Sequence, residues 1–139
     1  FNRQQSEATM ITVNGASKTQ RKYAESMAVF VCKKFGISPE IEINFRRMTK
    51  DENFGYCCHL EEKEFEVDVK RSLRLRDMLT TLAHELVHVK QYMNDEMPDE
   101  LEGDYWDRPH EIEAHGRETG LFIRWAEQNK LSHYKWTKV

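Results

Sequence analysis

The sequence predicts an α+β fold in one domain spanning residues 1–139. Two observations predict this class. Amphipathic helical patterns near both ends of the chain flank a middle segment of short runs in which apolar and polar residues alternate, and no repeat or linker divides the chain. The 39% hydrophobic and 32% charged content is typical of a globular protein rather than a disordered one. A chain of this length can bury one compact core.

The first helix is predicted to begin at Ser17 or Thr19 and to run to about Phe35. Gly36 suits the left-handed position that ends many helices, because glycine has no Cβ to clash there. Pro39 then prevents the helix from continuing, since proline lacks the backbone donor and fixes φ.

Strand patterns lie on both sides of this helix. Residues 41–45, 54–60 and 65–69 are the three clear strands, and 10–13 is a short fourth candidate. The short connections favour antiparallel hairpins, so we expect a small, mostly antiparallel sheet of three to four strands. The strand at residues 65–69 has acids on one face, at Glu64, Glu66 and Asp68, and we expect it at the sheet edge.

Two further helices are predicted after the strands. The span from Leu73 to Met93 repeats apolar residues every three or four positions, with Ser72 as a plausible N-cap. A last helix is predicted from near Pro109, a residue favoured at the first helical position, to about Asn129. Its core-facing stripe is expected to contain Ile112, Gly116, Thr119, Ile123 and Ala126.

The first of these two helices contains the motif His-Glu-x-x-His, with His84, Glu85 and His88. Residues four apart on a helix share one face, so both imidazoles can bind one Zn²⁺. Glu85 can then take a proton from a water that the metal activates. The motif predicts one zinc ion per chain, with His84 and His88 as ligands and Glu85 as the catalytic general base.

A catalytic zinc takes three protein ligands, and the third is expected on the helix after Pro109. Glu113 is the preferred candidate, because Gly116 and Gly120 follow it on the same side and would let the two helices approach closely. Glu111 is expected to cap the start of that helix instead. Glu111 and His115 remain the alternative third ligands.

The two segments together resemble a known family. His-Glu-Leu-Val-His, followed about 25 residues later by Pro-x-Glu-x-Glu-Ala, is similar to the zincin-type metallopeptidases, in particular the glutamate-zincin branch, over residues 73–125. Similar short chains occur in phages and bacteria, some described only as SprT-like peptidases. The resemblance implies a minimal zincin-like domain that hydrolyses peptide bonds. A SprT-like arrangement would use a histidine as third ligand, for which only His115 matches, whereas the ImmA/IrrE pattern favours Glu111 and the thermolysin-like pattern Glu113.

A peptidase also needs a donor for the oxyanion and a surface for its substrate. The candidate donors or supporting residues around the metal are Tyr105, His110, His115, His133 and Tyr134. A peptide or protein substrate is expected to pair with the strand at residues 65–69 by adding a strand to the sheet. A metal-binding module of the same fold without peptidase activity is the alternative function.

Charge and composition narrow the partners and the compartment. The formal net charge of -3 gives no global polycation for nucleic acid. A protease acting on nucleic-acid-bound proteins is a further alternative, because the sequence has a local basic patch. The patch contains Arg46, Arg47, Lys70, Arg71, Arg74 and Arg76. No apolar run approaches the length of a membrane span, and no signal-like N-terminus is present. Three cysteines without a CxxC pair predict no disulfide framework, so the cytoplasm is expected, that of the host if a phage encodes the chain.

Overall fold

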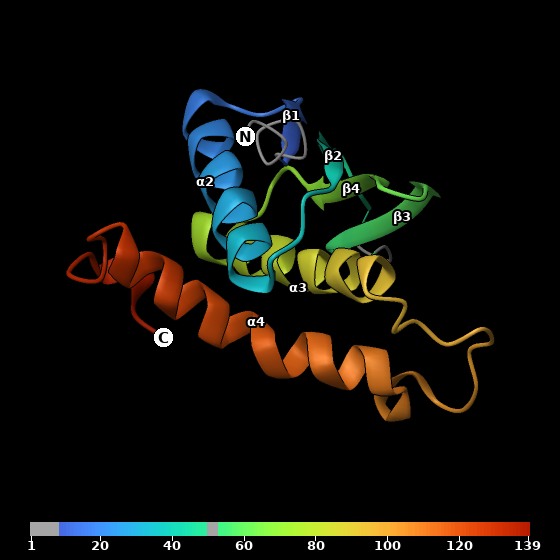
Figure 1. Ribbon diagram of the computed structural model, residues 1–139. Coiled ribbons are helices and arrows are strands. Elements are labelled where there is room, and N and C mark those ends of the chain that lie inside the picture. Colours follow the sequence, from blue (N-terminus) through green and yellow to red (C-terminus); the bar gives the residue numbers. More distant parts are fainter. Residues whose placement is uncertain (1–8, 50–52) are drawn as a thin grey trace.

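The computed structural model describes residues 9–49 and 53–139. Four strands form one sheet in the order β1–β2–β4–β3. Their bounds are Met10–Asn14 for β1, Glu40–Arg46 for β2, Gly55–Glu61 for β3 and Glu64–Lys70 for β4. The main helices are α2 (Lys18–Phe35), α3 (Leu75–Met93) and α4 (Pro109–Gln128), and the short helical turns are η1 (Tyr105–Asp107) and η2 (Lys135–Thr137). The α+β class is therefore confirmed (Figure 1).

The sheet is mixed, which corrects the expectation of a mostly antiparallel sheet. β1 pairs with β2 and β2 pairs with β4 in parallel, and β4 pairs with β3 in the antiparallel hairpin that the sequence predicts. The first pairing is parallel because helix α2 carries the chain back between β1 and β2, and a helical crossover restores the strand direction.

The strand at residues 65–69 lies inside the sheet, so its predicted edge position is wrong. β4 is flanked by β2 and β3, and β3 is an edge strand beside it. Phe65, Val67 and Val69 are fully or almost fully buried against the helices, which draws β4 to a central position. Glu66 and Asp68 face the other side of the sheet, where Arg46 pairs with both. The acids of β4 therefore indicate the face of the sheet opposite the helices, and they do not indicate an edge strand.

Helix α2 has the ends that the sequence predicts. Ser17 is its N-cap and forms a reciprocal capping box with Gln20, which satisfies backbone donors of the first turn. Gly36 follows the last turn with φ 67° and ψ 35°, the left-handed conformation expected of it. The start of α3 differs slightly, since Arg74 rather than Ser72 precedes its first residue.

Helix α3 is the central element of the molecule. It lies between the sheet and α4, and it also packs against α2 (Figure 1). Every residue from Leu82 to Gln91 is buried. Leu79, Leu82 and Leu86 are fully buried in the one hydrophobic core that the strands and helices share. Because α3 is covered on several sides, the polar side chains of its middle turns are held in an environment with little water.

Helix α4 runs back along α3 after the connection at residues 94–108 (Figure 1). Its buried residues include Ala114, Leu121, Phe122 and Trp125. Trp125 is fully buried, and its Nε1 donates to Ser26 Oγ of α2 at 3.0 Å. Among the described residues, no helix has the length and apolar content that crossing a membrane would require.

Candidate metal centre

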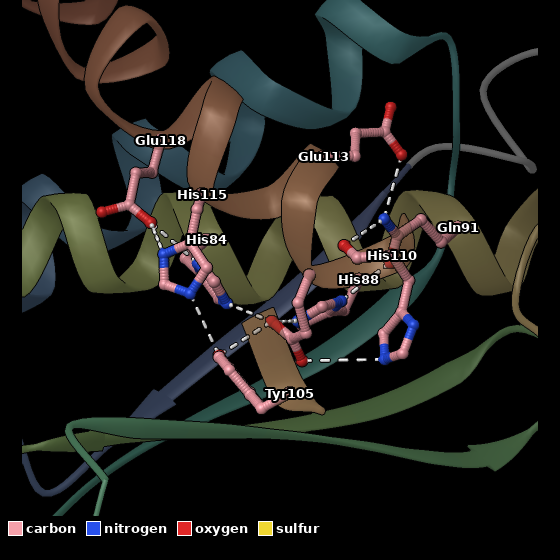
Figure 2. A network of polar contacts seen from close by, with 9 residues as sticks. His84, His88, Gln91, Tyr105, His110, Glu113, His115 and Glu118 are labelled. Carbon is pink, nitrogen blue, oxygen red and sulfur yellow. Dashed lines mark hydrogen bonds and ion pairs between the residues drawn. The ribbon is translucent and has the colours of Figure 1, made fainter. Parts of the chain in front are cut away.

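Helix α3 holds the two histidines and the glutamate of the motif in place. His84 is 8%, Glu85 8% and His88 7% exposed. The His84 and His88 ring centroids are 4.9 Å apart, on successive turns of the same face (Figure 2). The structure therefore brings the three motif residues into one largely dehydrated site.

Glu111, on the first turn of α4, faces both histidines. Its Oε1 lies 3.0 Å from His84 Nε2 and 3.2 Å from His88 Nε2. Burial acts to raise the pKa of Glu111, but the charge of His88, the hydrogen bond from Tyr105 and the charge of His84 outweigh it, so the pKa is lowered. Glu111 is an ionised carboxylate aimed at two imidazole nitrogens.

The other ring nitrogens of the two histidines are occupied. His84 Nδ1 lies 2.8 Å from Glu118 Oε1, and His88 Nδ1 lies 2.7 Å from Gln91 Oε1 (Figure 2). Because carboxylate and amide oxygens accept hydrogen bonds, each Nδ1 carries a proton, and in the neutral form of each ring the lone pair of Nε2 faces Glu111. Two imidazole nitrogens therefore converge on one carboxylate oxygen. Such a donor set fits a cation, and imidazole with carboxylate suits zinc.

Glu113 does not face the histidines, contrary to the preference derived from the sequence. Its Oε1 accepts from Gln91 Nε2 at 2.9 Å, and its Oε2 accepts from Lys90 Nζ at 2.8 Å and Arg117 Nε at 2.9 Å. Burial acts to raise the pKa of Glu113, but the hydrogen bonds from Lys90, Gln91 and Arg117 outweigh it and lower the pKa to about 2. Glu113 thus supports His88 through Gln91.

The error came from the rotational setting of α4. Ile112 is 56% and Ile123 37% exposed, so these members of the predicted core stripe do not face the core, whereas Ala126 is buried there as predicted. Gly116 and Gly120 have open space where a Cβ would lie, and neither allows a close helix contact. Nor does Glu111 cap the helix, since Arg108 is the N-cap and forms no side-chain cap bond.

Glu118 was not among the site residues predicted from the sequence. It lies on the same face of α4 as Glu111 and His115, and that spacing is the signal that could have identified it. Glu111, His115 and Glu118 follow at spacings of four and three, which places them on one side of α4. Glu118 Oε1 contacts both His84 Nδ1, at 2.8 Å, and His115 Nδ1, at 3.1 Å. Glu118 therefore links α4 to α3 through His84.

His115 and Tyr105 stand at the opening of the site. His84, Glu111 and His115 offer ligand atoms that lie within 4.8 Å of one another. Tyr105 Oη lies 3.0 Å from Glu111 Oε1 and 3.0 Å from His115 Nε2. Burial first, then the hydrogen bond to Glu111, raises the pKa of Tyr105, so its hydroxyl keeps its proton and donates it. Both candidates from the sequence are thus brought to the centre (Figure 2).

The remaining candidates divide into one residue inside the site and two outside it. His110 is 7% exposed, and its Nε2 lies 3.7 Å from Glu111 Oε2. The rings of Tyr134 and His133 are tilted against one another with centroids 4.1 Å apart, and neither residue lines the cavity beside the two motif histidines. Their proposed part as donors at the site is therefore wrong, because the tail after α4 folds away from the cavity.

Glu85 faces the same cavity, and the pKa of its carboxyl group is raised. Burial raises the pKa of Glu85 to about 7. The charge of His84 acts to lower this pKa, and the charges of Glu111 and Glu118 act to raise it. Strand β3 passes directly beside it, since a Cβ added at Gly55 would lie 3.3 Å from Glu85 Cγ and 2.8 Å from Thr81 Cγ2. A carboxylate with such a pKa can both accept and release a proton near neutral pH.

The cavity above these residues has a volume of about 930 Å³. It is bounded by the start of β3, the side of α3 that carries the two motif histidines, the connection at residues 94–108 and the first turns of α4. The lining contains His84, Glu85, His88, Glu111 and Glu118. The cavity is large enough for several residues of a ligand.

Comparison of the chain with protein-family models, with curated proteins and with solved structures returned no match. The function of the chain is therefore inferred from the geometry of the side chains described above.

Proposed function

We propose that the chain is a zinc-dependent peptidase of the zincin type. The observation that carries the proposal is the convergence of His84 Nε2 and His88 Nε2 on Glu111 Oε1, at 3.0 and 3.2 Å, beside the buried Glu85. His84, His88 and Glu111 would hold the ion. When bound, zinc supplies a Lewis acid that polarises a peptide carbonyl and lowers the pKa of water.

Glu85 is the general base and then the general acid. Its carboxylate takes one proton from the attacking water, whose oxygen forms a bond to the carbonyl carbon. When the C–N bond breaks, Glu85 gives that proton to the leaving amine. Glu85 is buried and lines the same cavity as His84 and His88, which supports this role.

Tyr105 is the best placed donor for the oxyanion that forms on the carbonyl oxygen. Its hydroxyl is protonated and borders the cavity beside Glu111 and His115. Glu118 accepts from His115 Nδ1 and thereby fixes the ring beside it. Donors held in place before the reaction stabilise developing charge without reorganisation.

Strand β3, and not β4, would orient the substrate. It pairs with β4 on one side, and no described strand pairs with its other side. Gly55, Tyr56 and Cys57 line the cavity, so an extended peptide added to this edge would pass the centre.

The proposal is tested by measuring zinc content and peptide hydrolysis on the same preparations. We expect about one zinc per chain, lost in His84→Ala. We also expect Glu85→Gln to keep the zinc and to lose hydrolysis of unfolded protein substrates. Hydrolysis that survives in Glu85→Gln with zinc bound would refute the mechanism.

A metal-binding module without peptidase activity is the second candidate, and one observation favours it. His115 lies close enough to His84 and Glu111 to act as a fourth protein ligand. Four protein ligands would close the site, as in structural zinc centres. Zinc that is retained in the wild type without any turnover of peptides, and lost in His115→Ala, would favour this candidate.

Action on nucleic-acid-bound proteins has less support. Arg46 pairs with Glu66 and Asp68, which removes it from the basic patch. Arg47 and Arg71 border a separate hollow of about 430 Å³. Binding of duplex DNA that weakens steeply with salt would favour this substrate class, and no binding at low salt would exclude it.

A further inference from the structure

The walls of the cavity are apolar on the side of the sheet. Phe54 and Tyr56 line it from the start of β3 and are 52% and 40% exposed. Neither side chain is needed in the core, and large apolar groups left in water at a cavity are typical of binding surfaces. One wall can therefore receive an apolar side chain.

The opposite wall is also apolar and is formed by the connection between α3 and α4. Leu101 is 57% and Trp106 70% exposed, and both line the cavity. The Trp106 ring is held in place by the rings of His115 and Tyr105, with centroids 4.9 and 5.1 Å away. A fixed, exposed tryptophan presents a large contact area at little cost in side-chain entropy.

The cavity lining carries several acidic side chains, among them Glu85, Asp99, Glu111 and Glu118. Among the described residues, no lysine or arginine lines the cavity, although Lys70 Nζ lies 5.4 Å from the centroid of the Phe54 ring. The connection at residues 94–108 has one basic residue, Arg108, whose Nε donates to the Gly103 carbonyl oxygen. Its acids are Asp95, Glu96, Asp99, Glu100, Glu102, Asp104 and Asp107. Glu96 pairs with Lys90 at 2.7 Å, and Asp99 is the acid of this connection that lines the cavity. A wall of this charge attracts a cationic side chain and repels an anionic one.

A buried polar group in the cavity is also without a partner. His110 is 7% exposed and lines the cavity, and its Nδ1 has no hydrogen-bond partner among the described residues. Buried polar atoms nearly always have a partner, so this nitrogen indicates a ligand with hydrogen-bonding groups. A peptide backbone has such groups.

We propose that the cavity takes an extended peptide segment in which a bulky apolar side chain is next to a lysine or arginine. The apolar side chain packs between the β3 wall and Trp106, and the cationic side chain faces Asp99. This inference rests on the proposed function, since it names the substrate class of the same site.

The test measures binding separately from cleavage. Four blocked octapeptides, identical except for a central Phe-Lys, Phe-Gln, Phe-Glu or Ala-Lys pair, are titrated against the Glu85→Gln protein, and the same peptides are offered to the wild type. We expect the Phe-Lys peptide to bind about fivefold more tightly than Phe-Gln and more tightly still than Phe-Glu. We also expect a loss of about tenfold for Ala-Lys.

Matched variants locate the two contacts. Asp99→Lys is expected to abolish the preference for Phe-Lys over Phe-Gln, and Glu25→Lys, an equal charge change on the exposed side of α2, to retain it. Trp106→Ala is expected to remove most of the difference between Phe-Lys and Ala-Lys, and Ile112→Ala, on the exposed side of α4, to leave it unchanged.

The two proposals fail separately. Equal binding of all four peptides, or no binding of any, would overturn the substrate inference, even if the wild type hydrolyses other peptides. The expected order of binding would support it even if the wild type cleaves none of them, in which case the peptidase function alone would fall.

Discussion

The Oε1 atom of Glu118 lies 2.8 Å from the Nδ1 atom of His84, on the side of the imidazole ring that faces away from Glu111. This contact ties α4 to α3 and fixes which nitrogen of His84 is free to bind a cation. Burial acts to lower the pKa of His84, but the hydrogen bond to Glu118 and the charges of Glu85, Glu118 and Glu111 raise it. The carboxylate makes the ring more basic, as a partner behind a metal ligand does.

Glu118→Ala is expected to weaken zinc binding by about 10–100-fold, because His84 loses the acceptor that orients it. Glu118→Gln keeps an acceptor oxygen and is expected to recover part of the loss. Affinity is measured by competition with a chromogenic chelator. Glu127→Ala, an exposed position farther along α4, is the control, and equal affinities in Glu118→Ala and Glu127→Ala would show that Glu118 does not position His84.

Glu111→Ala and Glu113→Ala are expected to affect different properties of the protein, the first zinc binding and the second stability. Glu111→Ala removes the carboxylate that faces both histidines and is expected to abolish stoichiometric zinc binding. Glu113→Ala is expected to retain zinc but to lower the free energy of unfolding by about 1–2 kcal/mol, since Lys90 and Gln91 each lose a partner. Metal analysis and denaturant unfolding of the same samples separate the two. Loss of zinc in Glu113→Ala alone would restore the ligand that the sequence favoured.

The stability of the protein is expected to depend on Glu113 below neutral pH. The pKa of Glu113 is lowered from 4.5 to about 2, so its contribution is fully present above pH 4.5 and is lost as the pH falls from 4.5 toward 2. Glu113→Gln is expected to give a shallower decline of unfolding free energy over this range, measured by urea denaturation. Glu127→Gln is the control. Parallel declines in the wild type and Glu113→Gln would contradict the lowered pKa.

Two glycines give a matched pair for the contact between β3 and α3. A Cβ at Gly55 would lie 2.8 Å from Thr81 Cγ2 and 3.0 Å from the Asp68 carbonyl oxygen, so Gly55→Ala must displace the strand. We expect a loss of about 1–3 kcal/mol in unfolding free energy. Gly116→Ala meets nothing within 4 Å and is expected to stabilise the exposed face of α4 by about 0.5–1 kcal/mol. A Gly55→Ala protein as stable as the wild type would show that β3 does not press against α3.

Much of the local structure was predictable from residue patterns. The capping box at Ser17, the left-handed Gly36 and the start of α4 at Pro109 each depend on the chemistry of a few neighbouring residues. The burial of α3 was predictable as well, because its apolar residues recur on the helical period. For the same reason the spacing of His84 and His88 placed both rings on one face without any knowledge of the fold.

The amino-acid sequence by itself determined the helices, the strands and the His-Glu-x-x-His face. The tertiary structure alone decided which carboxylate meets that face. Glu111 and Glu113 are two residues apart, which places them about 200° apart around the helix axis. The packing of Ala114, Leu121, Phe122, Trp125 and Ala126 on the core therefore sets which of the two carboxylates faces the histidines. The tertiary structure also decided that β4 is a central strand and β3 an edge strand. Strand order follows from burial in three dimensions rather than from connection length.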